Sequence, residues 1–527
     1  MAAATTGASA SAIEKKTTET TRPAITDIEP TPRPLPLPLP HVVLLASPGI
    51  GHLTPLAELA RRLVTHHGFA ATLVTLSTAG FSDAAAEAAV LSSMPATVSI
   101  AALPPVALDD LSPDVGFGAV MFELLRRSLP HLRALMLSSA SFTSTAALVC
   151  DFFGTAALPV AAELGVRGYV FLPNSFALLS VMRFVAELHD DAAPGEEEYR
   201  DLPDPLFLLP GCCLRHAELP DGFRDRADPV YAYVVEEARR YARADGFLVN
   251  SFEELEPAMA EGFRCDAAEG AFPPVYAVGP FVRQKTGSED EEEEDDELGC
   301  LEWLDRRPVG SVVYVSFGSG GALSVAQTAE LAFGLESSGH GFLWVVRMPS
   351  LDGNCYALGA GSHDANVNDP LAWLPEGFLE RTKDRGLAVA GWAPQTRVLA
   401  HPATAGFVSH GGWNSTLESL ASGVPIIAWP LYAEQKMNAA ILTGVTGVAL
   451  HPPVGREDGF VTRHEVVAAI RELVEGDKGS AVRRRAKQLQ EAAARACMPE
   501  GSSRRALGEV AAKWRAELGN GTRVHEL

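Results

Sequence analysis

Short apolar runs that end in glycine-rich turns and lead into amphipathic segments recur along this chain. In the first half, residues 41–46 (HVVLLA) form such a run, the turn SPGIGH follows, and an amphipathic segment opens at Thr54. Residues 70–76 form the next apolar run. A strand, a glycine turn, a helix and another strand make the βαβ unit of a parallel sheet. The pattern therefore predicts a doubly wound α/β domain, with further strands at residues 146–150 and 168–172.

The second half repeats this pattern. Residues 311–317 predict a strand, GSGG a turn, and Ser324 with Gln327 a capping box that starts a helix. The further apolar runs predict strands at residues 342–347, 387–391, 405–409 and 424–429. We therefore expect two doubly wound domains. Such sheets bind ligands at the carboxyl ends of their strands, so a cleft between the two domains is the expected site.

The length of 527 residues also fits two domains better than one. Between the halves, nine consecutive acidic residues (Glu289 to Glu297) cannot be buried and predict a solvated loop. The first forty residues, rich in Ala, Thr and Ser and then in Pro, predict a disordered tail. The expected divisions are a tail at 1–40, a first domain at 41–282, a linker at 283–299, a second domain at 300–505, and a C-terminal helix and tail at 506–527.

Charge and cysteine content narrow the class of protein. The 43 basic and 66 acidic residues give a net charge of −23, which disfavours binding to nucleic acid or to an anionic membrane surface. The seven cysteines are scattered, odd in number and without a CxxC pair, as expected for reduced thiols. No apolar stretch approaches the ~18–20 residues that span a bilayer. We expect a cytoplasmic, monomeric protein without a nucleic-acid partner or an integral membrane segment.

One segment of the second half has the features of an anion site. The predicted strand at 405–409 leads into His410-Gly-Gly and a helix whose first turn holds Asn414 and Ser415. Free backbone N–H groups at such a helix start bind anions, and glycine lets a ligand approach the chain. The segment therefore predicts a diphosphate site. The alternative is that Ser415 and Glu418 form only a capping box.

The stretch from Trp392 to Gln435, WAPQTRVLAHPATAGFVSHGGWNSTLESLASGVPIIAWPLYAEQ, closely resembles the signature segment of plant secondary-product UDP-glycosyltransferases. SPGIGHL, FGSGGAL and WPLYAEQKMNA extend the likeness to the branch that glucosylates hydroquinone and monolignols. The resemblance covers roughly residues 41–518. It implies the GT-B fold: two Rossmann-like α/β domains that face each other across a cleft, with the acceptor mostly on the first and UDP-sugar on the second.

The resemblance also assigns a UDP-sugar site. It implies that Trp392 stacks on uracil, for which an indole face is well suited, although a tryptophan there could otherwise belong to the core. Near the base and ribose it places Ala393, Gln395 and Glu418. It assigns the diphosphate to Ser319, His410, Asn414 and Ser415, and the sugar hydroxyls to Trp413, Glu434 and Gln435. A glutamine at the last position tends to accompany glucose in this family. Gly411, where many relatives have cysteine, is a departure that we expect to matter little.

A catalytic base is expected from the first half. His52 follows the PGIG turn, and an imidazole has an ordinary pKa near working pH, so it can take a proton from an acceptor hydroxyl. Asp151 follows the predicted strand at 146–150 and resembles the family's aspartate that orients the base and stabilises the imidazolium. The alternative for Asp151 is a helix cap. With UDP-glucose as the donor that the resemblance implies, we expect a single in-line displacement. A double displacement needs two carboxylates that flank one sugar, and the sequence singles out no such pair, so we expect inversion and a β-D-glucoside.

Other activities stay open or are disfavoured by particular residues. A nicotinamide oxidoreductase requires GxGxxG after the first strand, and PGIGHL lacks the third glycine. A binding protein without activity is expected to lose His52 or Asp151. No DxD pair is placed to hold a metal, so we expect no metal and no cofactor besides the co-substrate UDP-glucose. The same fold acting on nitrogen, sulfur or carbon nucleophiles, or using another UDP-sugar, remains the alternative.

The acceptor is the least defined part of the prediction. The loops of the first domain are apolar enough for a small phenolic or other aromatic guest, and we expect such a molecule to be the acceptor. The candidate wall residues are Phe122, Phe152, Phe176 and Phe207. Asn174 is a weaker acceptor-site candidate, and it departs from the threonine that relatives often have near the sugar.

Overall fold

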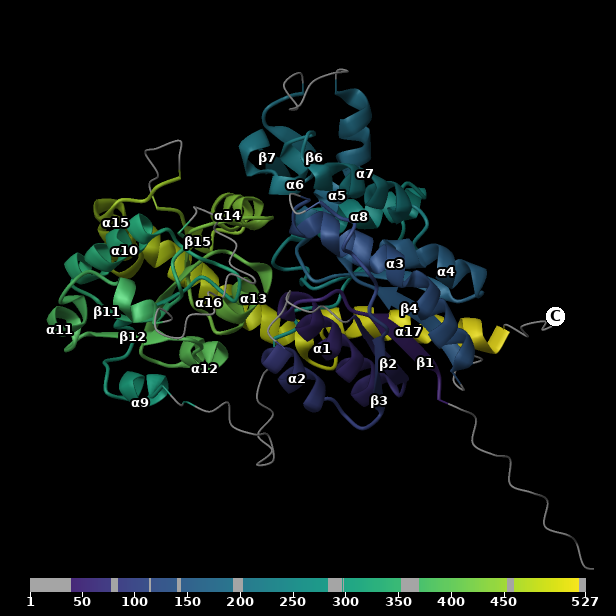
Figure 1. Ribbon diagram of the computed structural model, residues 1–527, viewed down its shortest axis with the longest axis horizontal. Coiled ribbons are helices and arrows are strands. Elements are labelled where there is room, and N and C mark those ends of the chain that lie inside the picture. Colours follow the sequence, from purple (N-terminus) through teal and green to yellow (C-terminus); the bar gives the residue numbers. More distant parts are fainter. Residues whose placement is uncertain are drawn as a thin grey trace, which may run out of the picture. The chain divides into compact units, whose positions relative to one another are not determined.

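The protein is described here by a computed structural model, which covers residues 39–520 except 77–83, 113–114, 140–143, 193–201, 283–295, 297, 352–368 and 453–458. The described residues form two parallel sheets with helices on their faces and one small hairpin (Figure 1). The predicted disordered tail and acidic linker lie almost wholly outside the described residues. No described helix combines the length and the apolar character that crossing a membrane requires.

The first sheet has the strand order β3-β2-β1-β4-β5-β8-β9 among the described residues. Its strands are β1 His41–Leu45, β2 Ala70–Leu76, β3 Val98–Leu103, β4 Thr145–Cys150, β5 Arg167–Leu172, β8 Gly246–Val249 and β9 Val275–Ala277. The helices of this half are α1 Ile50–His67, α2 Ala84–Ser92, α3 Phe117–Ser138, α4 Leu158–Glu163, α5 Phe176–Asp191, α6 Asp221–Arg224, α7 Pro229–Tyr241 and α8 Pro257–Glu269, with the short 3-10 helices η2 Phe152–Ala157 and η3 His216–Glu218. An antiparallel hairpin pairs β6 Leu206–Leu209 with β7 Cys212–Leu214.

The second sheet has the order β12-β11-β10-β13-β14-β15. Its strands are β10 Val312–Ser316, β11 Gly341–Val346, β12 Gly386–Ala390, β13 Thr404–Ser409, β14 Ile426–Ala428 and β15 Ala449–Leu450. Its helices are α9 Cys300–Asp305, α10 Val325–Ser338, α11 Phe378–Thr382, α12 Gln395–Ala400, α13 Trp413–Ala421, α14 Gln435–Gly444, α15 Arg463–Glu475 and α16 Asp477–Cys497, with η4 Pro370–Trp373. The predicted strands of both halves are confirmed to within one or two residues at each end.

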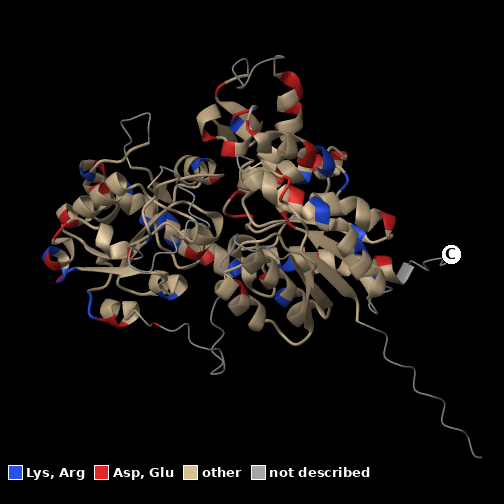
Figure 2. Cartoon of the chain, in the orientation of Figure 1, with Lys and Arg blue, Asp and Glu red and all other residues tan. Residues whose placement is uncertain are grey.

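Burial on both faces explains why the strands read as apolar runs rather than as alternating patterns. Helices cover a parallel sheet on each side, so consecutive side chains are both buried. β1 and β10, which lie in the interior of the two sheets, are buried at every position. Figure 2 shows the acidic and basic residues on helices and loops; among the described strands of the two sheets, only β5 has a charged residue, Arg167.

Each sheet has a point at which the strand order reverses. β1 lies between β2 and β4, and β10 lies between β11 and β13, so the chain leaves each middle strand in one direction and later returns on its other side. Ligands of open α/β sheets bind at the carboxyl ends of the strands at such a point. In this chain the two positions are the segments that follow β1 and β4, and those that follow β10 and β13.

The last helix returns to the first half of the chain. α17, Ser502–Asn520, contacts β4 and β9 and lies among the elements of the first sheet (Figure 1, yellow). Leu507, Val510 and Trp514 are buried in the same cluster as Val42 and Leu44 of β1. The predicted division at 505 falls inside this helix, and the helix completes the core of the first half.

Three local predictions differ from the structure. α1 begins at Ile50 rather than at Thr54, because Gly49, with φ 102°, ends the turn there. The Ser324 hydroxyl accepts from the Gln327 amide as predicted, but the Gln327 side chain bonds both backbone groups of Val461 instead of closing a capping box. Within the acidic run, the Asp296 carboxylate accepts from the Cys300 and Leu301 amides at the start of α9, so this residue has a structural contact.

Candidate active site

The residues after β1 and β4 meet in a hydrogen-bonded group of three. His52 Nδ1 lies 3.0 Å from Asp151 Oδ2, and the imidazole is 27% exposed, whereas Asp151 is fully buried. Ser47 donates twice to the same carboxylate, from its amide to Oδ2 at 2.9 Å and from its hydroxyl to Oδ1 at 2.5 Å. The register explains the meeting, because Leu45 of β1 pairs with Cys150 of β4 and the two segments leave the sheet side by side.

The arrangement determines which imidazole nitrogen can react. A hydrogen bond from Nδ1 to a carboxylate fixes the tautomer with a proton on Nδ1, so that Nε2 carries the lone pair. The helix-cap alternative for Asp151 does not apply, since its side chain makes no capping bond at η2. Ser47 was not among the predicted site residues. Its position directly after the first strand, in the SPGIGH turn, was the signal available in the sequence.

An aromatic cluster lies beside the His52 ring. The Phe153 ring is 5.2 Å from the His52 ring between centroids and 4.8 Å from Phe122, and Phe122 stacks on Tyr233 at 5.6 Å. Phe152 packs against Phe153 at 4.9 Å. Two predicted wall residues, Phe122 and Phe152, therefore belong to the aromatic cluster that contacts the imidazole through Phe153. Phe153 and Tyr233 are members of this cluster that the sequence reasoning missed.

The other two predicted phenylalanines lie elsewhere. Phe176 is buried and packs against Phe263 in the core, and the side chain of Phe207 on β6 is 78% exposed. An aromatic side chain in an apolar segment can line a pocket or belong to the core, and only the fold distinguishes the two.

His410, directly after β13, is buried, and its Nδ1 has no hydrogen-bond partner among the residues that the structure describes. Burial lowers the pKa of His410 to about 4, so the ring is neutral near pH 7. Two glycines make room for it. An added Cβ at Gly318 would lie 2.7 Å from His410 Cε1, and one at Gly412 would lie 2.3 Å from His410 Nε2. The glycines of the FGSGG and HGG motifs thus allow the imidazole to lie between the ends of β10 and β13.

Gln395 and Glu418, predicted near the base and the ribose, form one network with Ser415, which was predicted for the diphosphate. Gln395 Nε2 donates to Ser415 Oγ at 3.0 Å and to Glu418 Oε2 at 2.6 Å. Ser415 is the third residue of α13, and the N-cap of this helix is Gly412. Because a capping box needs its serine at the N-cap, the capping-box alternative for Ser415 and Glu418 does not hold. The indole of Trp392 is 55% exposed, unlike a core tryptophan, while Ala393 beside it is buried.

Two residues at the start of α13 bond to the first half of the chain. The indole N–H of Trp413 donates to the Asn250 carbonyl at 2.7 Å, and the Asn414 amide donates to the Gly51 carbonyl at 3.0 Å. The Gly51 carbonyl is free for this bond because Pro55, four residues later in α1, has no N–H to donate. The side chain of Trp413 is thus committed to Asn250, and Asn414 ties the predicted diphosphate segment to the turn that bears His52.

The predicted sugar residue Glu434 bonds across to the first half as well. Asn174 Nδ2 donates to Glu434 Oε1 at 3.0 Å, so Asn174 contacts the UDP-sugar residues rather than the aromatic cluster. Burial raises the pKa of the Glu434 carboxyl above its ordinary value, against the opposing effects of the Asn174 bond and the nearby His52. Gln435 is buried, and its Oε1 accepts from the Leu431 and Tyr432 amides.

Two further positions bear on the predicted diphosphate site. Ser319 follows β10, and its backbone carbonyl accepts from Arg347 Nη2 at 2.7 Å. This bond does not use the Ser319 hydroxyl. Gly411 has φ 79°, a conformation that favours glycine. A residue with a Cβ, such as cysteine, would be strained in this backbone at position 411.

The fold and this site define a class of enzyme. The family model of UDP-glucoronosyl and UDP-glucosyl transferases matches residues 288–482, the region that holds the second sheet and its predicted nucleotide-sugar residues. The two parallel sheets agree with the GT-B architecture of the solved glycosyltransferases that the chain resembles.

The relatives define the family more closely. The hydroquinone glucosyltransferase of Rauvolfia serpentina is 43% identical over 479 residues, which cover 91% of this chain and 98% of the relative. The structure of Phytolacca americana UGT2 complexed with UDP-2fluoro-glucose and pterostilbene is 39% identical, with a TM-score of 0.79 over 91% of this chain and 100% of the other. A UDP-glucosyltransferase from Polygonum tinctorium capable of glucosylating indoxyl, in complex with 3,4-dichloroaniline, is 41% identical, with a TM-score of 0.80 over 91% and 99%. The chain therefore belongs to the plant UDP-glycosyltransferase family.

Proposed function

We propose that this enzyme transfers glucose from UDP-glucose to a hydroxyl of a small phenolic or other aromatic acceptor, with inversion, to give a β-D-glucoside. The observation that carries the proposal is the His52 ring, which is bonded to a buried aspartate on one side and is in contact with the aromatic cluster on the other. The names of the relatives, which include hydroquinone and indoxyl glucosyltransferases, support an acceptor of this kind.

The proposed reaction is a single displacement. His52 Nε2 takes the proton of the acceptor hydroxyl, and the oxygen attacks the anomeric carbon as the bond from that carbon to UDP breaks. Asp151 stabilises the imidazolium that forms. Attack from the face opposite to UDP inverts the configuration. A positioned general base contributes ~10²–10⁴-fold to such a step.

In this proposal, the segments that follow β10 and β13 bind the diphosphate of the leaving UDP. The first turn of α13 offers backbone N–H groups, and a buried histidine with an unpartnered nitrogen, His410, lies next to it. Donors fixed before the reaction stabilise charge as it develops on UDP. Exposed Trp392 and the Gln395–Glu418 pair are then left for uracil and ribose.

The test compares His52→Ala with His66→Ala, which removes an exposed histidine at the other end of the same helix. With radiolabelled UDP-glucose and hydroquinone, we expect His52→Ala to lower kcat by ~10²–10⁴-fold while the Kd for UDP stays unchanged. His66→Ala should match the wild type. Near-wild-type activity of His52→Ala would refute the base assignment.

Product analysis tests the rest of the proposal. NMR of the hydroquinone product should show a β-linkage, and an α-linked product would exclude inversion. The same assay with an aniline and a thiophenol, and with UDP-galactose in place of UDP-glucose, tests the alternative nucleophiles and donors. Faster transfer to nitrogen or sulfur, or from UDP-galactose, would favour one of those alternatives.

A further inference from the structure

Ala433 has an unusual backbone for an alanine. Its φ is 54°, and it is the one non-glycine residue with positive φ in the described part of the chain. L-residues with a Cβ rarely adopt this left-handed conformation, and where they do, the surroundings hold them in it. Ala433 is exposed and directly precedes Glu434 and Gln435. The conformation at Ala433 therefore sets the direction in which the chain enters α14.

The contacts that hold Ala433 come from the other half of the chain. Asp221, the first residue of α6, accepts the Ala433 amide on Oδ2 at 2.8 Å and donates its own amide to the Ala433 carbonyl at 3.2 Å. A single residue of the first half thus satisfies both backbone groups of Ala433. Two such bonds fix the orientation of both peptide planes that flank the residue.

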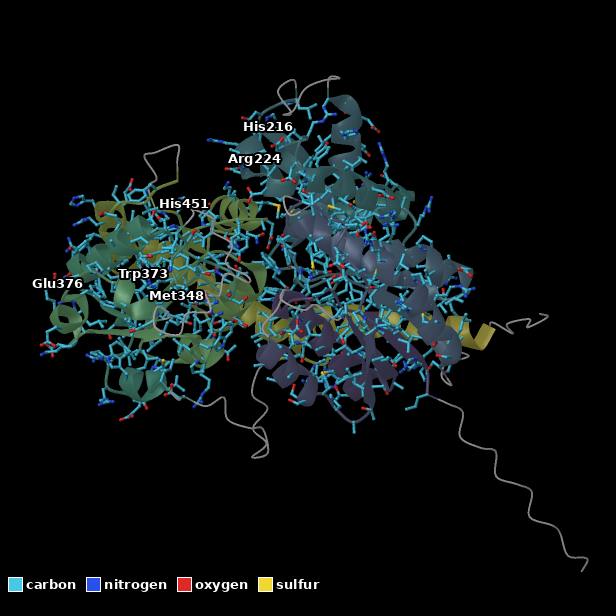
Figure 3. All side chains as sticks on the ribbon, in the orientation of Figure 1. His216, Arg224, Met348, Trp373, Glu376 and His451 are labelled. Atoms are coloured by element: carbon cyan, nitrogen blue, oxygen red, sulfur yellow. The ribbon has the colours of Figure 1, made fainter. Side chains whose placement is uncertain are left out.

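Two basic side chains face the Asp221 carboxylate. Lys436 Nζ, from the first turn of α14, and Arg224 Nη2, on α6 and labelled in Figure 3, each lie 3.4 Å from Asp221 Oδ1. Lys436 adds a second link from Asp221 to the segment 433–436. The carboxylate is 37% exposed, so we assign the orienting effect mainly to the backbone bonds rather than to the ion pairs.

The remaining contacts of the segment leave Glu434 and Gln435 dependent on this turn. Gln435 Oε1 closes the loop from inside by accepting from the Leu431 and Tyr432 amides, and Asn174 reaches the Glu434 carboxylate. None of these bonds involves the backbone of Ala433. Removal of the Asp221 side chain would leave the Ala433 amide without its acceptor, while the backbone amide at position 221 still donates to the Ala433 carbonyl. Held by one bond instead of two, Ala433 would relax toward an ordinary alanine conformation, which would turn Glu434 away.

We propose that Asp221 is a positioning residue for the donor sugar: it holds Ala433 in the left-handed conformation and thereby directs Glu434 toward the hexose of the UDP-sugar. This inference rests on the proposed function, in which Glu434 contacts the sugar hydroxyls. Because Asp221 and Ala433 belong to different halves, the sugar subsite is complete only when the two halves are in contact.

The test separates the sugar from the nucleotide. Binding of UDP and of the unreactive donor analogue UDP-2-fluoroglucose is measured by calorimetry for the wild type, Asp221→Ala and Asp221→Asn. Because Glu434 is displaced in Asp221→Ala, the affinity of this variant for the analogue should fall by about tenfold or more, while its affinity for UDP should stay within about twofold of the wild type. Asp221→Asn should retain most of the affinity, because its amide oxygen still accepts from the Ala433 amide.

Two further variants make the test specific. Ala433→Gly in the Asp221→Ala background should restore much of the affinity for the analogue, because glycine adopts positive φ without support. Asp225→Ala is the matched control, since the Asp225 carboxylate bonds the Ala227 amide within its own segment. It should bind both ligands like the wild type.

Several results would overturn the proposal. Equal weakening of UDP binding and analogue binding in Asp221→Ala would indicate a general structural defect, and no change in either affinity would show that the Asp221 side chain is not needed to hold Ala433. If Asp221→Asn were as weak as Asp221→Ala, charge rather than the backbone bond would be the cause. Glu434→Ala separates failure of the proposed function from failure of this inference. If Glu434→Ala leaves the affinity for the analogue unchanged, the assignment of Glu434 to the sugar fails. If the affinity falls in Glu434→Ala but not in Asp221→Ala, only the role of Asp221 is refuted.

Discussion

At the scale of single residues, burial of His410 links donor binding to stability. The ring occupies space that two glycines leave open, and its Nδ1 has no partner within the described part of the chain. Such a site excludes the charged imidazolium, because a buried cation without a partner is costly. The cost is the reason that the pKa of His410 falls to about 4, and it keeps a neutral ring in the predicted diphosphate site.

This shift predicts a pH dependence. In the unfolded chain His410 takes up its proton near pH 6.5, whereas in the fold it does so near pH 4, so the unfolded state binds more protons between these values. The stability due to neutral His410 is therefore present above about pH 6.5 and is lost as the pH falls toward 4. Between pH 7 and pH 5 the loss is about 2 kcal/mol.

The measurement is denaturant unfolding of the wild type and His410→Gln at pH 7 and pH 5. His67, whose pKa burial also lowers to about 4, contributes in the same direction, so the difference between the two proteins isolates His410. The variant should lose less stability than the wild type over this interval. An equal loss in both proteins would contradict the assignment.

At the scale of elements, glycines and one proline decide how the site segments are joined to the sheets. Gly49 lets α1 begin early enough to put His52 in its first turn, and Pro55 leaves the Gly51 carbonyl free for Asn414. Gly318 turns the chain after β10 with φ 74°. In each case a local residue type determines which group of a neighbouring element can be reached.

Gly318→Ala should therefore affect the donor site beyond its backbone cost. Both Gly318 and Gly310 have positive φ, but an added Cβ at Gly310 meets nothing within 4 Å, whereas at Gly318 it meets the His410 ring. Each substitution should cost about 1–2 kcal/mol of stability from the backbone. Only Gly318→Ala should also lower the affinity for UDP, by about tenfold or more, because the His410 ring must move. Calorimetric titration of UDP into both variants decides this, and equal affinities would contradict the steric argument.

At the scale of the whole molecule, the chain is tied together twice. α17 packs Leu507, Val510 and Trp514 into one core cluster of the first half. α14, which follows the signature segment, packs Met437 and Ile441 into the other core cluster of that half. Asp221, Asn174 and Asn250 add polar bonds between the halves. The two halves therefore depend on each other for stability as well as for the site.

Trp514→Ala tests the contribution of α17. Trp514 is fully buried and packs edge-on against Phe69 and Tyr169, so its removal leaves a large cavity in the first core. We expect a loss of about 3–5 kcal/mol in unfolding free energy. Trp303→Ala, at a half-buried indole in the second half, should cost about 1 kcal/mol. Thermal unfolding of both variants provides the comparison; similar midpoints would show that α17 is peripheral to the first core.

The sequence by itself determined the strands of both sheets, the α/β fold and the family, because apolar runs, glycine turns and a long signature segment are local signals. From the sequence, the roles of His52, Asp151 and the signature residues are predictions that the resemblance implies. Only the tertiary structure decided which residues meet across the fold. Ser47 joins Asp151, Phe153 and Tyr233 complete the aromatic cluster, Asn174 contacts Glu434, and Asp221 holds Ala433. The hydrogen bonds among these contacts join residues that are 104 to 260 positions apart in the chain, and no periodicity or local motif indicates a partner so distant. Distance along the chain is the physical reason that they required the fold.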